Sequence, residues 1–162
     1  MLHVVLYQPA IPQNTGNIAR STVGFAAALH LVHPMKFEIT DHAVKRAGLD
    51  YWPHVRLTQH ADDAAFLTWL DGHRRTCNAH AWLVTKFGDT RFDRAGYGPD
   101  DVLILGNENH GLPGSWHRDP RFKGRLHIPM PGAATSNIRS YNLGNAAAIV
   151  LATATARLTP EA

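Results

Sequence analysis

Three short stretches of the chain are almost continuously apolar, and they limit what it can fold into. They are residues 2–7 (LHVVLY), 81–85 (AWLVT) and 102–105 (VLIL), and all are rich in β-branched, aromatic or leucine side chains. Strands that are covered on both faces have this composition, whereas strands with one wet face alternate apolar and polar residues. We therefore expect an α/β fold built on a mostly parallel sheet with helices on both faces.

Segments of helical periodicity alternate with these strands. Apolar or small side chains at positions 18, 22, 25 and 29 predict a helix that Asn14 or Thr15 would cap. Asp62 and Asp63 begin a second helix, and positions 143, 147, 150, 151, 154 and 158 define one face of a long third helix. Further strands are expected at 29–33, 55–58 and 126–128, with a brief helix at 41–46 that ends near Gly48. Without a linker or repeat, residues 1–162 form a single domain.

Polar turns rich in glycine and proline follow three of the predicted strands. KFG follows 81–85, GNENHGLP follows 102–105, and the stretch from Pro129 to Asn142 separates the last strand from the C-terminal helix. In open α/β sheets ligands bind beyond the carboxyl ends of the strands. The three turns therefore predict one shared pocket.

The charge and the cysteine content restrict the partners and the compartment. There are 16 Lys and Arg against 13 Asp and Glu, which leaves a net charge of +3 and allows a basic face for phosphates. Cys77 is the single cysteine, so a reducing compartment is expected. The first residues resemble a strand and not a signal peptide, and no apolar run approaches the roughly 18 residues of a membrane span. We expect a cytoplasmic protein with no membrane partner.

Other kinds of site fit the sequence poorly. Leu112 and Pro113 stand where a P-loop needs Lys and Ser or Thr, and no G-x-G-x-x-G follows the first strand. His30 and His33 have a ligand-like spacing but no evident third ligand, so no metal is expected. Structural interpretations also remain open: GNENHGLP as a plain turn, Arg20 as a solvated arginine, and Ser140 and Asn142 as helix caps.

Several blocks of residues, in this order, resemble a known family. They are 14–20 (NTGNIAR), 46–52 (RAGLDYW), 106–108 (GNE) with 111–113 (GLP), 128–130 (IPM), and 139–143 (RSYNL) with Asn145. The chain is similar from end to end to SPOUT-class RNA 2'-O-methyltransferases, and most similar to the tRNA (cytidine/uridine-34) 2'-O-methyltransferase family. The resemblance implies a homodimer, a C-terminal trefoil knot (the α/β-knot fold) and S-adenosylmethionine as cofactor.

The resemblance also implies roles for individual residues. The substrate would be the ribose of wobble nucleotide 34 in a tRNA anticodon stem-loop, with Arg20, Glu108 and Asn142 at the reacting atoms. The cofactor would lie against Leu83, Gly106, Ile128, Met130, Ser140 and Leu143. Nucleic-acid contacts are expected from Arg20, Arg46, Lys86 and Arg139.

Two questions stay open from the sequence. The family describes its arginine as a general base, but a guanidinium with a pKa above about 12 accepts protons poorly, so Arg20 serves equally well as a phosphate and alkoxide clamp. The alternative functions are 2'-O-methylation of another tRNA or rRNA position, or a non-catalytic knotted RNA-binding protein.

Overall fold

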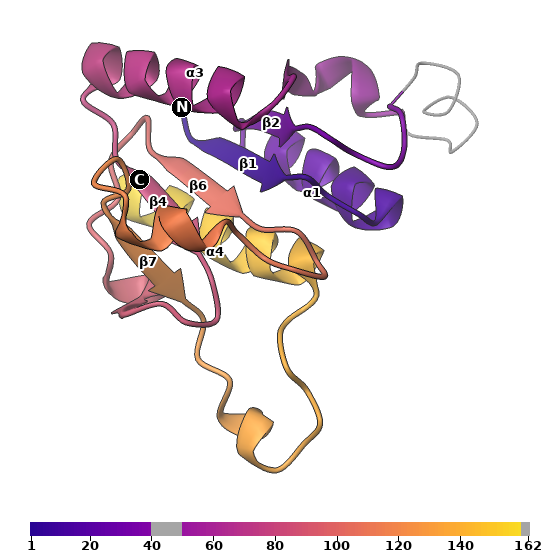
Figure 1. The fold of residues 1–162 in the computed structure, drawn as a ribbon, viewed down its shortest axis with the longest axis vertical. Helices are drawn as coiled ribbons and strands as arrows, with labels where there is room; N and C mark the ends of the chain where they lie inside the picture. Colours follow the sequence, from indigo (N-terminus) through magenta and orange to yellow (C-terminus); the bar gives the residue numbers. More distant parts are fainter. Residues whose placement is uncertain (40–49, 160–162) are drawn as a thin grey trace.

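The core of the protein is one sheet of parallel strands. The computed structural model describes residues 1–39 and 50–159. The strands are β1 (His3–Tyr7), β2 (Ala28–Val32), β3 (Arg56–His60), β4 (Ala81–Val84), β5 (Thr90–Arg91), β6 (Val102–Leu105) and β7 (Gly124–His127). Their order in the sheet is β3-β2-β1-β6-β4-β7-β5, and every ladder between them is parallel. The predicted mostly parallel sheet is therefore confirmed (Figure 1).

Helices cover both faces of this sheet, as predicted. Val4 and Leu6 of β1 pack in the same cluster as α1 (Pro12–Gly24) and α4 (Leu143–Leu158), which lie side by side (Figure 1). The alternate residues Val5 and Tyr7 pack with α3 (Asp63–Cys77). Successive side chains of a strand point to opposite faces, so a strand buried on both sides must be apolar throughout.

The start and the end of α1 differ from the sequence prediction. The helix begins at Pro12, whose fixed φ suits a first helical position, and the N-cap Ile11 offers no side-chain acceptor. Asn14 and Thr15 are therefore buried inside the first turn and do not cap it. At the other end Gly24 is the last helical residue. Phe25 and Leu29, which the periodicity assigns to the helix, therefore lie in the following turn and in β2.

The other helices agree more closely with prediction. The Asp62 carboxylate accepts a hydrogen bond of 2.8 Å from the Ala65 amide and so caps α3, and Asn142 caps α4. Short 3-10 turns complete the described residues: η1 (Trp52–His54), η2 (Phe92–Arg94), η3 (Gly114–Arg118) and η4 (Pro131–Ala134). The brief helix predicted at 41–46 lies outside the described residues. No helix in the described part of the chain is long and apolar enough to span a bilayer.

A row of histidines crosses the sheet beneath α3. His3, His30 and His60 stand on three neighbouring strands, and their rings are linked by contacts of 2.9 Å between His3 and His30 and 3.0 Å between His30 and His60. Trp69 of α3 packs against all three rings and stacks on His73. Burial, followed by neighbouring charges, lowers the pKa of His3 to about 4 and that of His30 to about 3.

This row should make the fold sensitive to acid. An unfolded chain takes up protons on these rings near pH 6.5, whereas the folded chain resists until about pH 4 for His3 and about pH 3 for His30. The unfolded state thus binds more protons in this window, so the free energy of unfolding should fall as the pH drops from about 6.5 to 4. For the buried His30 the slope reaches ~1.4 kcal/mol per pH unit.

Urea titrations at pH 7, 6, 5 and 4.5 measure this slope. His30→Gln should make the slope shallower, and His54→Gln, at an exposed ring of η1 outside the row, is its matched control. A free energy of unfolding that stays level between pH 6.5 and 5 would show that the row does not resist protonation.

Candidate active site

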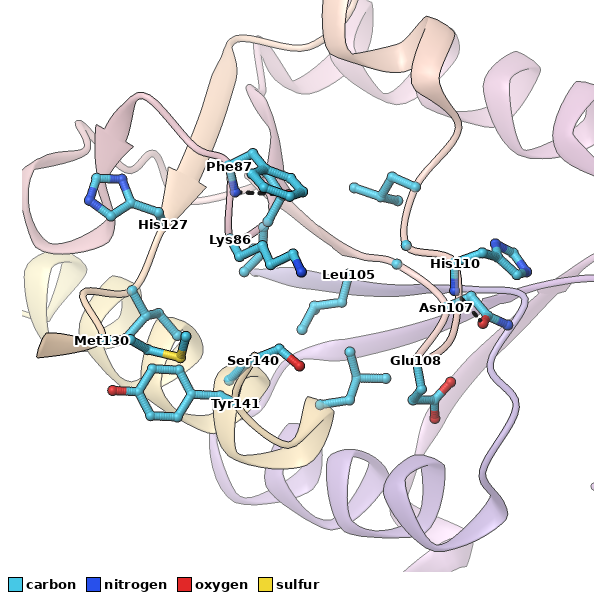
Figure 2. A pocket seen from close by; sticks show the side chains of 18 of the residues that line it. Lys86, Phe87, Leu105, Asn107, Glu108, His110, His127, Met130, Ser140 and Tyr141 are labelled. Atoms are coloured by element: carbon cyan, nitrogen blue, oxygen red, sulfur yellow. Dashed lines mark hydrogen bonds between the residues drawn. The ribbon is translucent and has the colours of Figure 1, made fainter. Parts of the chain in front are cut away.

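The carboxyl ends of β6, β4 and β7, which are neighbours in the sheet, open into a cavity of about 550 Å³. Its walls come from residues 84–87, 105–112 and 127–130 after these strands, and from residues 140, 141, 143 and 146 at the start of α4. The shared pocket predicted at the strand ends is therefore present. Lys86 and Phe87 lie across the cavity from Ser140 and Tyr141, with His127 at one end and Glu108 and His110 at the other (Figure 2).

The loop after β6 folds tightly back on itself. Asn107 and Gly111 pair through backbone hydrogen bonds of 3.1 and 2.8 Å, and Gly111 has a left-handed φ of 72°. A Cβ on Gly106 would lie 2.5 Å from the carbonyl carbon of Gly111, so only glycine fits there. The Asn107 side chain accepts from the Asn109 amide at 2.8 Å. The cavity wall is therefore a rigid backbone surface.

Glu108 joins this loop to the beginning of α1. Its carboxylate accepts hydrogen bonds from the amides of Ala10 at 2.8 Å and Ile11 at 3.2 Å, and from the Asn14 side chain at 3.1 Å. Amides at the start of a helix have no partner within the helix and favour a negative charge. Glu108 thus binds, from a distant loop, the two backbone amides that lead into α1.

Asn142 continues this connection to α4. Its side-chain amide donates to Asn14 at 3.0 Å, and its oxygen accepts from the amides of Gly144 at 2.9 Å and Asn145 at 3.3 Å. The helix-cap interpretation of Asn142 is therefore confirmed. Asn14 links Glu108 with Asn142, so the two helix starts and the loop after β6 form one hydrogen-bonded unit.

Most of the residues predicted to contact a cofactor line the cavity. They are Gly106, Ile128, Met130, Ser140 and Leu143. Leu83 is the exception, because its side chain is fully buried in the cluster beneath α3. The next two residues, Val84 and Thr85, line the cavity instead.

The residues predicted to contact nucleic acid are more scattered. Lys86 lines the cavity. Arg139 is exposed and directly precedes Ser140, which lines the cavity. Arg20 is exposed on α1 and lies outside the cavity lining, with its guanidinium carbon 5.6 Å from the centre of the Tyr51 ring. Tyr51 in turn donates a hydrogen bond of 2.8 Å to the Gly16 carbonyl. Arg46 lies outside the described residues.

Several lining residues were not expected from the sequence. They are aromatic or imidazole side chains: Phe87, His110, His117, His127 and Tyr141. Phe87 and His110 belong to the polar turns from which the pocket was predicted. Their place in these turns was the sequence signal that could have identified them as lining residues. Within residues 1–39 and 50–159 no group of three or more His, Cys, Asp or Glu could hold a metal ion. His33 contacts Gln59 and does not share a site with His30.

Comparisons with known proteins agree with one another. The profile described as the SpoU rRNA Methylase family matches residues 1–152. A Methylovorus glucosotrophus protein named tRNA (cytidine(34)-2'-O)-methyltransferase is 36% identical over 151 residues, which span 93% of this chain and 92% of that protein. A Synechocystis protein named as a candidate for the same activity is 42% identical over 93% of each chain.

A solved structure is equally similar. It is described as giving structural insights into the 2-OH methylation of C/U34 on tRNA, and it is 40% identical to this chain. The two structures superpose with a TM-score of 0.85, over 99% of this chain and 98% of the other. The cavity and its walls therefore lie in the part of the molecule that these proteins share.

Proposed function

The chain belongs to the SpoU rRNA methylase family, and on this basis we propose that it methylates the ribose 2'-hydroxyl of nucleotide 34, a cytidine or uridine, in tRNA. The methyl donor is S-adenosylmethionine. The names of its relatives specify this nucleotide, and the sequences of these relatives match the chain along nearly its whole length. The observation that carries the proposal is the cavity at the ends of β6, β4 and β7.

The residues around this cavity fit the proposed cofactor. S-adenosylmethionine has a flat apolar base, a polar ribose and a zwitterionic amino acid end. The cavity offers apolar side chains from Leu105, Ile128, Met130 and Leu143 beside the rigid backbone of the loop after β6. Its volume of about 550 Å³ is typical of sites for small organic ligands. When bound there, the cofactor supplies a methyl group on a positively charged sulfur.

The side chains of this chain then have to position the nucleotide and the helices. Glu108, Asn14 and Asn142 fix the start of α1 and the start of α4 against the cavity wall. Lys86 places a positive charge at the cavity for a phosphate or a carboxylate. Displacement of a methyl group requires close alignment of the two reacting atoms, and rigid supports of this kind provide it.

Arg20 is best explained as an electrostatic clamp. A guanidinium stays protonated at neutral pH, so it can hold a phosphate and stabilise the oxygen that loses its proton, but it cannot take up that proton. Its position over the Tyr51 ring restricts the side chain while leaving it exposed. The proton of the 2'-hydroxyl then leaves to water or to phosphate.

We propose that the tRNA surface is completed by a homodimer with a knotted C-terminal segment. One flank of α4, with Ala146, Ile149 and Thr153, is only half-buried in a single chain, and Ile11 and Phe25 of the α1 region are exposed apolar side chains. A second copy would bury such surface. Lys86, Arg139 and Arg46 would contact the tRNA backbone, and because its substrate is a tRNA we place the reaction in the cytoplasm.

Gly106→Ala should weaken binding of S-adenosylmethionine about tenfold or more. The added Cβ would lie 2.5 to 2.8 Å from the backbone of Gly111 and Leu112, so the cavity wall would have to move. Calorimetry with the cofactor alone measures the change. Gly132→Ala is the control, because nothing lies within 4 Å of its Cβ position. Equal affinity in both variants would place the cofactor away from the loop after β6.

Total RNA, with both tRNA and ribosomal RNA, from a strain lacking wobble methylation tests the proposed function. Incubation with labelled S-adenosylmethionine should transfer label to the tRNA, at a rate that rises with the enzyme concentration. Label in ribosomal RNA and not in tRNA would favour the alternative function, 2'-O-methylation of an rRNA position. Cofactor binding without transfer to any RNA would instead support a non-catalytic RNA-binding protein.

A further inference from the structure

Phe87 is exposed in a way that the fold does not explain. Among the large apolar side chains of the described residues it is the most exposed, at 71%, whereas Phe66 and Trp116 are buried in the core. It stands in the wall of the cavity, on the turn that follows β4. An aromatic ring exposed at the edge of a cavity offers a flat face on which a planar ligand can stack.

The turn that carries Phe87 is rigid. Its backbone amide donates to the Thr85 hydroxyl at 3.3 Å, and the Gly88 amide donates to the Thr85 carbonyl at the same distance. Gly88 is pressed against β7, because a Cβ there would lie 2.5 Å from the Leu126 carbonyl carbon. The backbone that carries the ring is therefore held against Thr85 and β7, which keeps the ring at the cavity.

The charges around the ring favour an anionic partner. The ammonium of Lys86 lies 5.0 Å from the centre of the Phe87 ring. Among the described residues Glu108 is the only carboxylate in the lining, and it already accepts hydrogen bonds from the amides of Ala10 and Ile11. A nucleotide combines a flat base with an anionic phosphate. The base can stack on an aromatic ring while the phosphate contacts a neighbouring cation.

We propose that Phe87 and Lys86 form a stacking platform that holds a nucleobase of the tRNA anticodon loop beside the cavity. This inference rests on the proposed function. The ring stacks on the base and the Lys86 ammonium contacts a phosphate of the same strand. The proposed cofactor would lie against the apolar side chains of Ile128, Met130 and Leu143. Phe87 lies across the cavity from Met130 (Figure 2), so the ring face that does not carry the Lys86 ammonium is available to the RNA.

Substitutions of Phe87 test the platform. Stacking on one base contributes enough that Phe87→Ala should lower kcat/KM for tRNA about 10- to 100-fold. Phe87→Leu, which keeps an apolar side chain without a ring, should lose nearly as much, and Phe87→Trp should stay within about threefold of the wild type. Cofactor affinity and melting temperature should not change, because the ring is mostly exposed. Ile138→Ala, at a residue 59% exposed outside the cavity lining, is the control.

An anticodon-loop RNA with 2-aminopurine at nucleotide 34 or 35 reports stacking directly. Its fluorescence should be quenched by the wild type and by Phe87→Trp, and not by Phe87→Ala or Phe87→Leu. A Phe87→Leu enzyme with wild-type kcat/KM and quenching would overturn the platform. Weaker cofactor binding in Phe87→Ala would overturn it too, because the ring would then belong to the cofactor site. A wild-type enzyme that methylates no tRNA would instead refute the proposed function.

Discussion

Arg20→Ala is expected to reduce methyl transfer to tRNA by about 10²- to 10³-fold while leaving the affinity for S-adenosylmethionine unchanged. The side chain is exposed on α1 and lies outside the cavity lining, so its removal disturbs neither the fold nor the cofactor's walls. In the mechanism that we propose, the variant loses a positive charge that binds the phosphate and stabilises the oxygen that attacks the methyl group. Single-turnover kinetics and calorimetry on the same preparation separate the two effects.

Arg20→Lys makes this test more informative. Lysine keeps the charge but not the planar fork of donors, nor the same contact with the Tyr51 ring, so it should recover only part of the rate. If Arg20→Ala instead lost cofactor binding, Arg20 would belong to the cofactor site. An Arg20→Lys enzyme that is inactive across the pH range, together with an Arg20→Ala enzyme that regains activity at alkaline pH, would contradict the clamp and support a proton-accepting role for Arg20.

Glu108→Ala should lower both stability and activity. It removes the acceptor for two backbone amides and for Asn14 at the start of α1. Leaving such donors unpaired costs about 1–3 kcal/mol, and α1 also carries Arg20. We expect kcat/KM to fall about 100-fold together with a lower midpoint in urea. Glu108→Gln keeps one acceptor oxygen but turns an NH2 group towards a donor, so it should recover only part of the stability.

The pattern across Glu108 variants separates positioning from direct chemistry. If Glu108 acts by positioning α1, activity should follow stability, so Glu108→Gln would regain part of the rate in step with its stability, and Asn14→Ala would reproduce part of the loss. A fully stable but inactive Glu108→Gln enzyme would show that the negative charge itself takes part in the reaction.

The sheet and its helices were predictable from the sequence because burial on both faces demands continuous apolar runs. The start of α1 was not, since the backbone that leads into it is held by Glu108, which is 98 positions away from Ala10. No local pattern around Asn14 or Thr15 contains that information. The same limit applies to the histidine row, because His3, His30 and His60 meet only through the register of three strands.

The site was predictable to the level of its loops and less so to the level of side chains. Gly106, Glu108 and Ser140 lie where the strand-end turns placed them. Leu83 does not, because a shift of one residue along a strand moves a side chain to the opposite face. Phe87 was present in a predicted turn, but only the structure reveals that its ring is left open.

The most direct test uses short anticodon stem-loop RNAs in which a single ribose lacks its 2'-hydroxyl. With labelled S-adenosylmethionine, the enzyme should methylate the all-ribose RNA and the RNAs with deoxyribose at nucleotide 33 or 35. It should transfer nothing to the RNA with deoxyribose at nucleotide 34. Undiminished label in that last RNA, when the other loops are methylated equally well, would contradict the assignment of nucleotide 34 as the target.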